Sequence, residues 1–470
     1  MGSCYSRRRF LELGAGAAGM FLIQRSPFAE IARAQPTHLV RRNLEGLSAG
    51  HEIIRSFELA IARMKALPPT DPRSFAYQAA IHGTHRRGRP DSGWNSCVHG
   101  SELFWPWHRM YLYFFERIVR EMSGNPNWAL PFWDWTTQRK LPAMFRRRTS
   151  PLFVPQRNPA MNSGAGEIAQ SEVELRSRPG GDPNFLDQPD YIRARVAMEY
   201  GPHSMVHVRV GGWMWDAPTA AQDPIFWVHH ANVDRLWNRW LAEHDRLNLS
   251  ADQELSTKGF IFFDEHRNRV RLNACELIRS TAELGYSYEG ERPRVKQGCR
   301  PAEPRVPARE TLSRSPQSFV VGRKRATISL PIEGMEDKLR ALARNRRATL
   351  LLSLENVAAP RQPGTVWQVF LGRPQGTRPH PRSPHFIGHL SLFGTGVRAS
   401  SIHHFQPARF TFPVDSAIAA VLKRAQGRTI PLEFVPTGSL VNGKRASPRV
   451  AANVSVGGAR LLAETRRPRR

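Results

Sequence analysis

Six histidines fall into two separate groups of three, and their imidazole rings could bind two metal ions. The residues are His82, His99 and His108 in the first group, and His203, His207 and His230 in the second. Neutral imidazole is a good ligand for copper, and three such ligands leave one coordination position open. Two copper ions that face each other could bind dioxygen between them. The histidines therefore predict two copper ions as cofactors, with O2 as a co-substrate.

The spacing within the second group favours a helix. His203 and His207 are four residues apart, which places both side chains on one helix face. His230 follows a segment that begins with Asp223 and Pro224. This pair is typical of a helix start, because aspartate caps the first turn and proline needs no N–H donor there. A single pair of histidines at this spacing is more often a packing or surface feature, so the prediction depends on both groups together.

Several segments resemble those of one known family. Cys97–Glu116, in which His108 begins a strongly apolar helix, and Asp223–Trp237 resemble the two copper-binding signatures of the tyrosinase and polyphenol oxidase family. Pro131–Trp135 resembles the aromatic segment between the two sites of that family. Two further segments resemble the region that follows the catalytic domain in plant polyphenol oxidases and long bacterial tyrosinases, namely Gly259–Cys275 and Leu284–Tyr288.

The resemblance extends over residues 40 to 290 and implies a type 3 dicopper centre. It implies an oxidoreductase that acts on phenolic small molecules and converts o-diphenols to o-quinones with O2. Tyrosinase-type o-hydroxylation of monophenols is a further activity of the family. Two other interpretations stay open: the same six-histidine centre binds dioxygen reversibly in hemocyanins, and an o-aminophenol is an alternative substrate.

Hydrophobic periodicity predicts an α+β protein, in which a mainly α-helical four-helix-bundle dicopper domain is followed by a C-terminal β-sandwich. We divide the chain into residues 1–34 as an export signal, 35–250 as the dicopper domain, 251–300 as an extension packed on it, 301–316 as a linker, 317–440 as the β-sandwich and 441–470 as a basic tail. In latent family members the C-terminal domain lies over the copper site. The resemblance implies that this domain inhibits its own chain, and a purely structural role is the alternative.

The resemblance also implies roles for residues around the second group. Glu199 lies four residues before His203 and matches the plant-type position of a glutamate that orients a water molecule. Ser204 follows His203, where strongly hydroxylating relatives often carry asparagine, and this difference argues against strong monophenol hydroxylation. Ala217 replaces a bulky phenylalanine of many plant enzymes, which predicts a wide entrance.

Four more side chains are candidates for the substrate pocket or its surroundings. Phe226 belongs to a rigid apolar wall. Arg209 could line the entrance, as could His229, and a surface or packing role is the alternative for both. Asp234 lies one helical turn after His230, where it could support the copper ligands from behind, and an ordinary ion pair on the helix is the alternative.

Two cysteine arrangements have chemical consequences. Cys97 lies two residues before His99, where fungal members of the family carry a cysteine joined to that histidine by a thioether. The resemblance therefore implies a crosslink between Cys97 and His99, and a buried free thiol is the alternative. Cys275 and Cys299 could pair after export.

The first residues of the sequence predict where the protein is located. Ser6–Leu11 carries paired arginines before the apolar stretch Leu13–Ile23, and Ala32 to Ala34 offers a cleavage site of small residues. This pattern is typical of a twin-arginine export signal and predicts a periplasmic or secreted protein. A short buried or membrane helix is the alternative, but a bilayer requires about 20 apolar residues. No other stretch qualifies as transmembrane.

The net charge of +28 and the isoelectric point near 11.2 invite a nucleic-acid interpretation. The arginines are dispersed among Pro, Ala and Gly, and no basic motif with a known docking geometry occurs. A solvated basic surface is the simpler explanation, so we predict no specific nucleic-acid partner. Attraction to acidic polymers or anionic surfaces remains compatible with the charge.

Overall fold

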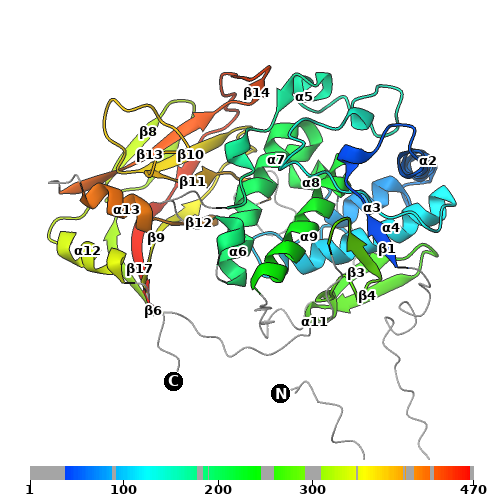
Figure 1. Cartoon of the computed structure of the whole chain (residues 1–470), viewed down its shortest axis with the longest axis horizontal. Coiled ribbons are helices and arrows are strands. Elements are labelled where there is room, and N and C mark those ends of the chain that lie inside the picture. Colours follow the sequence, from blue (N-terminus) through cyan, green and yellow to red (C-terminus); the bar gives the residue numbers. More distant parts are fainter. Residues whose placement is uncertain are drawn as a thin grey trace, which may run out of the picture. The chain divides into compact units, whose positions relative to one another are not determined.

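The computed structural model describes residues 38–86, 91–176, 184–188, 190–244, 259–291, 308–345, 348–394, 397, 407–423 and 428–465. These residues belong to one compact unit (Figure 1). The predicted export signal, the basic residues that end the chain and Cys299 lie outside the described residues, and so does any pairing of Cys299 with Cys275. No helix among the described residues is long and apolar enough to cross a membrane.

Helices build the first half of the chain. They are α2 (Glu52–Ala66), α3 (Phe75–His82), α4 (Phe104–Ser123), α6 (Tyr191–Met198), α7 (Ser204–Val210), α8 (Ala217–Ala220) and α9 (Ile225–His244). The helix α4 packs against both α2 and α9, and its residues 104–120 are all buried. It ends at Gly124, which adopts the left-handed conformation that glycine tolerates best.

The predicted start of the helix that carries His230 is confirmed. The Asp223 carboxylate accepts a hydrogen bond from the backbone N–H of Ile225 at 3.0 Å. Asp223 also forms a fully buried ion pair with Arg157 at 2.6 Å. The cap of α9 is therefore fixed by charge as well as by backbone geometry.

A π-helical turn, η6 (Glu199–His203), joins α6 to α7. Gly201 departs from helical angles there, and Pro202 lacks the N–H that a regular helix would use. This turn sets the position of His203. The next helical turn brings His207 beside it, with ring centroids 4.7 Å apart, as the spacing predicted.

Residues 259–291 pack on the helical core, where α11 and β3 contact α4. A hairpin of β3 (Gly259–Phe263) and β4 (Arg269–Asn273) leads into α11 (Ala274–Leu277), and β5 (Tyr286–Tyr288) pairs in parallel with β1 (Leu39–Arg41). Phe262 stacks on Phe114 of α4 at 5.3 Å. The extension thereby covers the outer side of a helix that carries a metal-site histidine.

Two four-stranded sheets form the C-terminal half, with strand orders β11-β10-β13-β8 and β12-β9-β17-β6. Their bounds are Ala308–Arg314 (β6), Ala326–Pro331 (β8), Ala348–Val357 (β9), Val366–Leu371 (β10), Phe386–Leu390 (β11), Ala408–Pro413 (β12), Thr429–Thr437 (β13) and Gly458–Thr465 (β17). Side chains from both sheets, including Leu352, Trp367 and Phe434, share one apolar core. The α+β fold class, a helical domain followed by β-sheets, is confirmed.

The boundaries of this domain differ from the predicted ones. The strand β6 lies within the segment 301–316 that we expected to be a linker, and β17 lies within the expected basic tail 441–470. These two strands pair with each other, and β17 also pairs with β9. Ala459, Leu461 and Ala463 are buried on one side of β17. The frequent arginines and prolines of segments 301–316 and 441–470 conceal the alternation of buried and less buried residues in the sequence.

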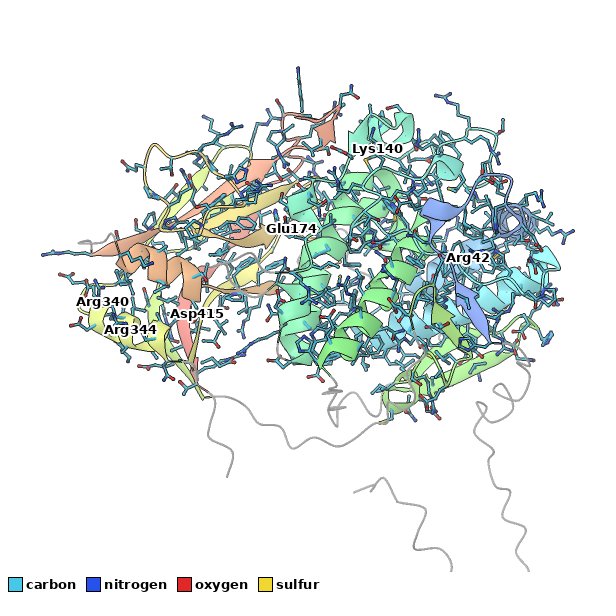
Figure 2. The ribbon with its side chains drawn as sticks, viewed as in Figure 1. Arg42, Lys140, Glu174, Arg340, Arg344 and Asp415 are labelled. Carbon is cyan, nitrogen blue, oxygen red and sulfur yellow. The ribbon has the colours of Figure 1, made fainter. Side chains whose placement is uncertain are left out.

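Exposed arginines lie on a helix of the C-terminal half. Two short helices, α12 (Glu336–Arg344) and α13 (Asp415–Leu422), lie beside β9. Figure 2 shows Arg340 and Arg344 on α12, and both are exposed. These arginines have the solvated placement that the simpler explanation of the net charge predicts.

A short sheet connects the two halves. Strand β14 (Leu440–Val441) pairs with β15 (Lys444–Arg445) on one side and with β2 (Gly166–Glu167) of the helical half on the other. The backbone N–H of Asn442 also donates to the carbonyl of Ala165 at 2.7 Å. The C-terminal half is thus joined to the helical half by main-chain hydrogen bonds.

Candidate metal centre

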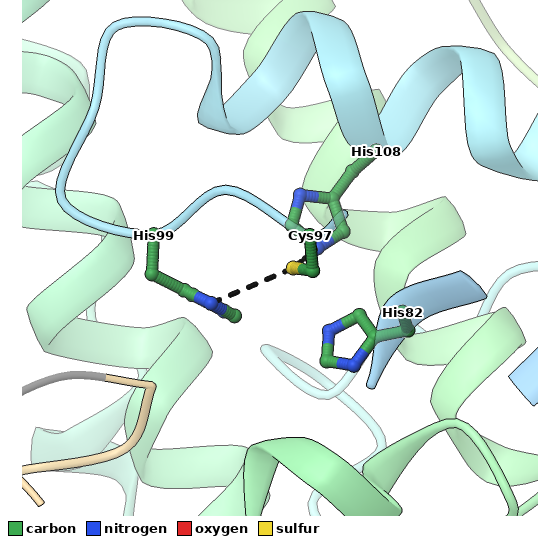
Figure 3. Close-up of side chains that lie close together, drawn as sticks. All are labelled: His82, Cys97, His99 and His108. Carbon is green, nitrogen blue, oxygen red and sulfur yellow. Dashed lines mark hydrogen bonds between the residues drawn. The ribbon is translucent and has the colours of Figure 1, made fainter. Parts of the chain in front are cut away.

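The structure brings the six predicted histidines into two clusters. His82 ends α3, His99 lies on a loop, and His108 lies on α4. Their nitrogen donors and the sulfur of Cys97 lie within 4.8 Å of one another (Figure 3). The second cluster consists of His203, His207, His229 and His230, again with donors within 4.8 Å of one another. The first cluster thus contains a thiol, and the second contains a fourth imidazole.

The clusters face each other inside the helical bundle. The rings of His108 and His230 stack with centroids 4.3 Å apart and planes inclined by only 4°. His99 lies 5.9 Å from His203 between ring centroids. In each of these two contacts, one histidine of the first cluster faces one histidine of the second cluster across a shared space.

Backbone carbonyls orient four of these rings. The Nδ1 atoms hydrogen-bond to the carbonyls of Ala217 (His82, 3.0 Å), Phe104 (His108, 2.7 Å), Glu199 (His203, 2.9 Å) and Met214 (His207, 2.7 Å). A carbonyl only accepts, so each Nδ1 carries the proton and each Nε2 keeps a lone pair. The Nε2 atoms of His82 and His203 are buried and have no hydrogen-bond partner among the described residues. Such orphaned lone pairs fit a metal ion.

The electrostatics favour neutral imidazoles. Burial lowers the pKa of His203 to about 4, and it lowers the pKa of His207 and of His230 well below the usual value, with neighbouring histidines adding to the effect. The pKa of His82 and that of His108 are lowered for the same main reason. Only the neutral ring can bind a metal through nitrogen, so these residues are ready to act as ligands at neutral pH.

Cys97 lies between two histidines of the first cluster. Its buried Sγ is 3.5 Å from Nδ1 of His99 and 3.5 Å from Nε2 of His108 (Figure 3). The sulfur therefore contacts the loop histidine and a helix histidine at once. The predicted proximity of Cys97 and His99 is present, and the contact with His108 is one that the sequence analysis did not include.

Glu199 and Ser204 lie beside His203 at the π-helical turn. The Glu199 carboxylate is buried, pairs with Arg195 and accepts a hydrogen bond from the N–H of Gly100 at 2.5 Å. Burial raises its pKa, although Arg195 opposes the rise. The Ser204 hydroxyl donates to the Glu199 carbonyl at 2.7 Å, so its proton points back along the chain.

The predicted pocket residues occupy three different places. Phe226 lies at the centre, with its ring 4.8 Å from that of His82 and 4.3 Å from that of His230. Ala217 is buried, and its carbonyl orients His82. Arg209 points toward the C-terminal half, where it pairs with Glu172 and donates to the hydroxyl and carbonyl of Thr437. The observed role of Ala217 is therefore that of its main-chain carbonyl, which orients the His82 ring.

Asp234 joins two metal-site helices. Its carboxylate pairs with Arg109 of α4 at 2.6 Å and accepts hydrogen bonds from the hydroxyls of Tyr286 and Tyr288 at 2.7 and 2.6 Å. Arg109 follows His108, and Asp234 lies one turn after His230. The ion pair therefore fixes the two helices, and through them the two clusters, at one separation.

One turn of the C-terminal half enters the centre. The ring of Phe393 stacks on that of His207, with centroids 3.6 Å apart and planes inclined by 13°. It also lies 5.5 Å from His203 and 5.6 Å from His99. A Cβ atom on Gly394, whose φ is +71°, would come within 2.6 Å of the His99 ring. No motif in the sequence distinguishes Phe393 from a core residue, so this turn was not predicted.

Comparison with known proteins agrees with this geometry. The family described as the common central domain of tyrosinase matches residues 72–188 and 169–243, and a domain of unknown function matches residues 308–408. Tyrosinase HcTyr1 of Hahella sp. (strain CCB-MM4) is 30% identical over 389 residues, covering 72% of this chain and 82% of that protein. Polyphenol oxidase A1 of Vicia faba is 33% identical over 51% of this chain, but the match spans only 46% of the plant protein.

Solved structures share the fold. A latent aurone synthase from its natural source aligns over 92% of this chain and 92% of its own, with a TM-score of 0.63 and 22% identity. Latent apple tyrosinase aligns over 92% of this chain and 98% of its own, with a TM-score of 0.58. A functional unit of octopus hemocyanin aligns with a TM-score of 0.52 and 16% identity. At these identities the likeness concerns the fold alone. From the sequence relatives and the two histidine clusters, we conclude that this chain belongs to the tyrosinase family and is an oxidoreductase of the tyrosinase and catechol oxidase kind with a type 3 dicopper site.

Proposed function

We propose that the chain oxidises o-diphenols to o-quinones with dioxygen. The main support is the pair of clusters whose lone pairs converge on a shared, buried space. The predicted ligands are His82, His99 and His108 for one copper ion and His203, His207 and His230 for the other. When bound, the copper pair supplies dioxygen binding and two-electron transfer. Two diphenols then release four electrons and four protons, and one O2 becomes two water molecules.

The chain's own residues hold the ligands and exclude water. Carbonyl partners fix the rings before any substrate arrives, which avoids reorganisation during the reaction. Phe226 and Phe104 contact the histidines and keep the space apolar. A flat aromatic substrate suits such walls.

Copper content and oxygen uptake test this proposal together. We expect two copper ions per chain, and uptake of O2 with catechol once the centre is accessible. A single copper ion per chain, or reversible oxygen binding without turnover on any phenol or o-aminophenol, would favour a different function. The reversible carrier is the second candidate because the structure covers the centre with Phe393, which would exclude a phenol more readily than O2.

We propose further that the C-terminal half keeps the enzyme latent, with Phe393 in the place of a substrate ring. The stack on His207 and the close approach of Gly394 to His99 support this. Phe393→Ala should raise catechol oxidation by the full-length chain about 10-fold or more, by increasing the open fraction. Phe386→Ala, which changes a β11 phenylalanine with no ring contact to the cluster histidines, is the matched control. Equal activity of the two variants would contradict the role of Phe393.

Monophenol hydroxylation should be the weaker activity. The Ser204 hydroxyl donates to a carbonyl, and the Glu199 carboxylate is engaged by Arg195 and Gly100. Neither group is arranged here to receive a phenolic proton. Ser204→Asn should raise the ratio of tyrosine to catechol turnover, and an unchanged ratio would show that this position does not control hydroxylation.

The thioether between Cys97 and His99 is also a proposal, supported by the 3.5 Å contact of Sγ with the His99 ring. Its formation removes one hydrogen from sulfur and one from a ring carbon, and copper with dioxygen would accept the two electrons. Mass spectrometry of the peptide that contains both Cys97 and His99 should show a mass lower by two hydrogen atoms than the unmodified sequence. Quantitative alkylation of Cys97 after unfolding would contradict the crosslink.

The paired arginines of Ser6–Leu11 support export by the twin-arginine route, and we keep this as a proposal. The route carries folded proteins, which suits a centre loaded with copper before export. Replacing Arg7 and Arg8 by Lys should retain the protein in the cytoplasm of an expressing bacterium. Normal export of that variant would contradict the assignment.

A further inference from the structure

A cavity of about 600 Å³ lies where the C-terminal half meets the helical half. One wall comes from α6 and the π-helical turn η6, and the facing wall comes from β11 and β12 (Figure 1). None of the six predicted copper ligands, all of which are among the described residues, lines this cavity. Its volume is in the range of pockets that bind small organic molecules. The cavity is therefore a site separate from the copper centre.

The walls of the cavity are rich in aromatic and aliphatic side chains. Phe386 of β11 and both Phe410 and Phe412 of β12 line one side. Tyr200 of η6 lines the other side, with its ring centroid 4.9 Å from that of Phe410. Ile192 of α6 also lines the cavity and is 41% exposed, which is unusual for a large aliphatic side chain. A flat aromatic molecule would cover this apolar surface.

The charged groups of the lining favour an anion. Four arginines and three glutamates line the cavity. Glu464 is shared between Arg193 and Arg309, so two cations face one carboxylate there. Arg382 is exposed, and its guanidinium forms no ion pair among the described residues. A carboxylate is the simplest group that would pair with this cation, because arginine binds it through two parallel hydrogen bonds.

The two walls lead directly to the contact that covers the copper centre. The strand β11 ends at Leu390, three residues before Phe393, whose ring stacks on that of His207. The turn η6 ends at His203, whose ring centroid is 5.5 Å from that of Phe393. The elements β11 and η6 also contact each other. A ligand that binds both walls at once therefore stabilises the arrangement in which Phe393 is seated.

We propose that this cavity binds an aromatic carboxylate and that the bound ligand holds the copper centre closed. The ring of the ligand packs against the apolar walls, and its carboxylate pairs with Arg382. The closing role rests on the latency stated under the proposed function. Binding itself requires neither copper nor turnover, so the site can be tested without either.

Binding of 2-naphthoate to the copper-free, full-length chain tests the site by equilibrium dialysis. Its amide, 2-naphthamide, has the same two rings without the charge. We expect Arg382→Gln to weaken 2-naphthoate binding about 10-fold, the loss of one charge-assisted pair, and to leave the affinity for the amide unchanged. Arg340→Gln, at an exposed arginine of α12 that does not line the cavity, is the matched control and should keep the parent affinity for both.

Ile192→Ser tests the apolar wall. This exposed position tolerates a small polar residue, and the variant should bind both the acid and the amide more weakly because apolar contact is lost. Equal affinity of the parent and Arg382→Gln chains for 2-naphthoate would overturn the proposed pairing with the carboxylate. Tighter binding of the straight-chain acid decanoate than of 2-naphthoate would overturn the choice of an aromatic ring.

The closing role has its own test. By linkage, a ligand that keeps Phe393 seated must bind the parent chain more tightly than Phe393→Ala. In the copper-loaded parent chain, 2-naphthoate should lower kcat for catechol oxidation, and Arg382→Gln should require about 10-fold more of it. Equal affinity of the parent and Phe393→Ala chains would overturn the closing role. Equal inhibition of the parent and Arg382→Gln chains would also overturn it, because the acid would then act at the copper centre.

Failure of the latency itself would give a different result. Phe393→Ala would then oxidise catechol no faster than the parent chain, whatever the affinity of either chain for 2-naphthoate. The dialysis measurements on the copper-free chain would still decide whether the cavity binds an aromatic carboxylate.

Discussion

The two histidine clusters contain equal numbers of predicted ligands but are held in different ways. In the second cluster every imidazole comes from η6, α7 or α9. In the first cluster His82 lies at the last residue of α3 and His99 lies on a loop. The sulfur of Cys97 and the turn at Gly394 both lie close to the ring of that loop histidine.

This difference shows how a loop ligand gains a fixed orientation. A helix position is set by the hydrogen bonds of its own backbone, which fixes where the His207 side chain leaves α7. A loop position lacks that constraint, and the first cluster obtains it from a neighbouring sulfur and from the C-terminal half. Within the first cluster, the orientation of His99 should therefore depend on the neighbouring Cys97 sulfur, whereas no such sulfur lies in the second cluster.

Removal of single ligands should have the largest effects. His230→Ala and His99→Ala should each lower diphenol turnover by about 1,000-fold or more, near 4 kcal/mol of transition-state stabilisation, because both ions are required. Copper analysis should sharpen the comparison, with His99→Ala keeping the second ion and His230→Ala keeping the first. The near-ultraviolet band of the oxygenated protein should vanish in both. Loss of both ions from each variant would contradict separately held clusters.

Asp234→Asn should weaken both clusters together. The substitution leaves Arg109 and Arg41 buried beside a neutral group, and a broken buried pair costs about 3–5 kcal/mol. Urea unfolding measures this loss. Glu333→Gln removes an exposed pair with Arg428 and should change the free energy of unfolding by no more than about 1 kcal/mol. If the two variants lose equal stability, Asp234 does not join the helices.

Acid should destabilise the copper-free chain mainly through the second cluster. Burial lowers the pKa of the following histidines: His82 and His108 in the first cluster, and His203, His207, His229 and His230 in the second. Below a pH of about 6.5 the unfolded chain binds protons that the folded chain refuses, until the pH falls to the folded pKa, about 4 for His203. Each histidine then costs about 1.4 kcal/mol per pH unit within this window.

Unfolding free energies between pH 7 and pH 5 test this slope. His229→Phe removes one titrating group of the second cluster and should make the fall in stability shallower. His266→Gln, at an exposed histidine outside both clusters, is the control variant. A copper-free chain that is as stable at pH 5 as at pH 7 would contradict the prediction.

Cys97→Ser should have the smallest effect and should act on one cluster only. Loss of the sulfur frees the His99 loop, so copper should leave the first cluster about 10-fold faster. The second cluster should keep its ion at the parent rate, as followed with a chelator. Faster release from both clusters would show that the sulfur supports more than the loop.

Part of this centre could be predicted from local sequence because its geometry is local. The helical spacing of His203 and His207 and the cap formed by Asp223 depend on neighbouring residues only, and the structure contains both. The grouping of the remaining histidines came from the resemblance, since nothing local relates His82 to His108. The helical domain and the sandwich were predicted from periodicity in the same way.

Other features depend on contacts between distant residues. Phe393 and His207 are 186 positions apart in the sequence, and no pattern near either residue indicates the contact. His229 was considered only for the entrance, because burial of both its nitrogens is a property of the folded bundle. The strand β17 was missed because it lies just before the arginine-rich end of the sequence, and its pairing with β6 and β9 depends on distant residues.

The pairing of β14 with β2 has a consequence for any release of the proposed latency by a protease. A cut in the chain between the two halves would leave this ladder intact, together with the ion pair of Arg193 and Glu464 and the Arg209 contacts to Thr437. The nicked fragments should therefore travel as one particle in gel filtration and separate only under denaturing conditions. A cut in the chain would therefore not open the copper centre by itself. Opening would also require that β14 separate from β2.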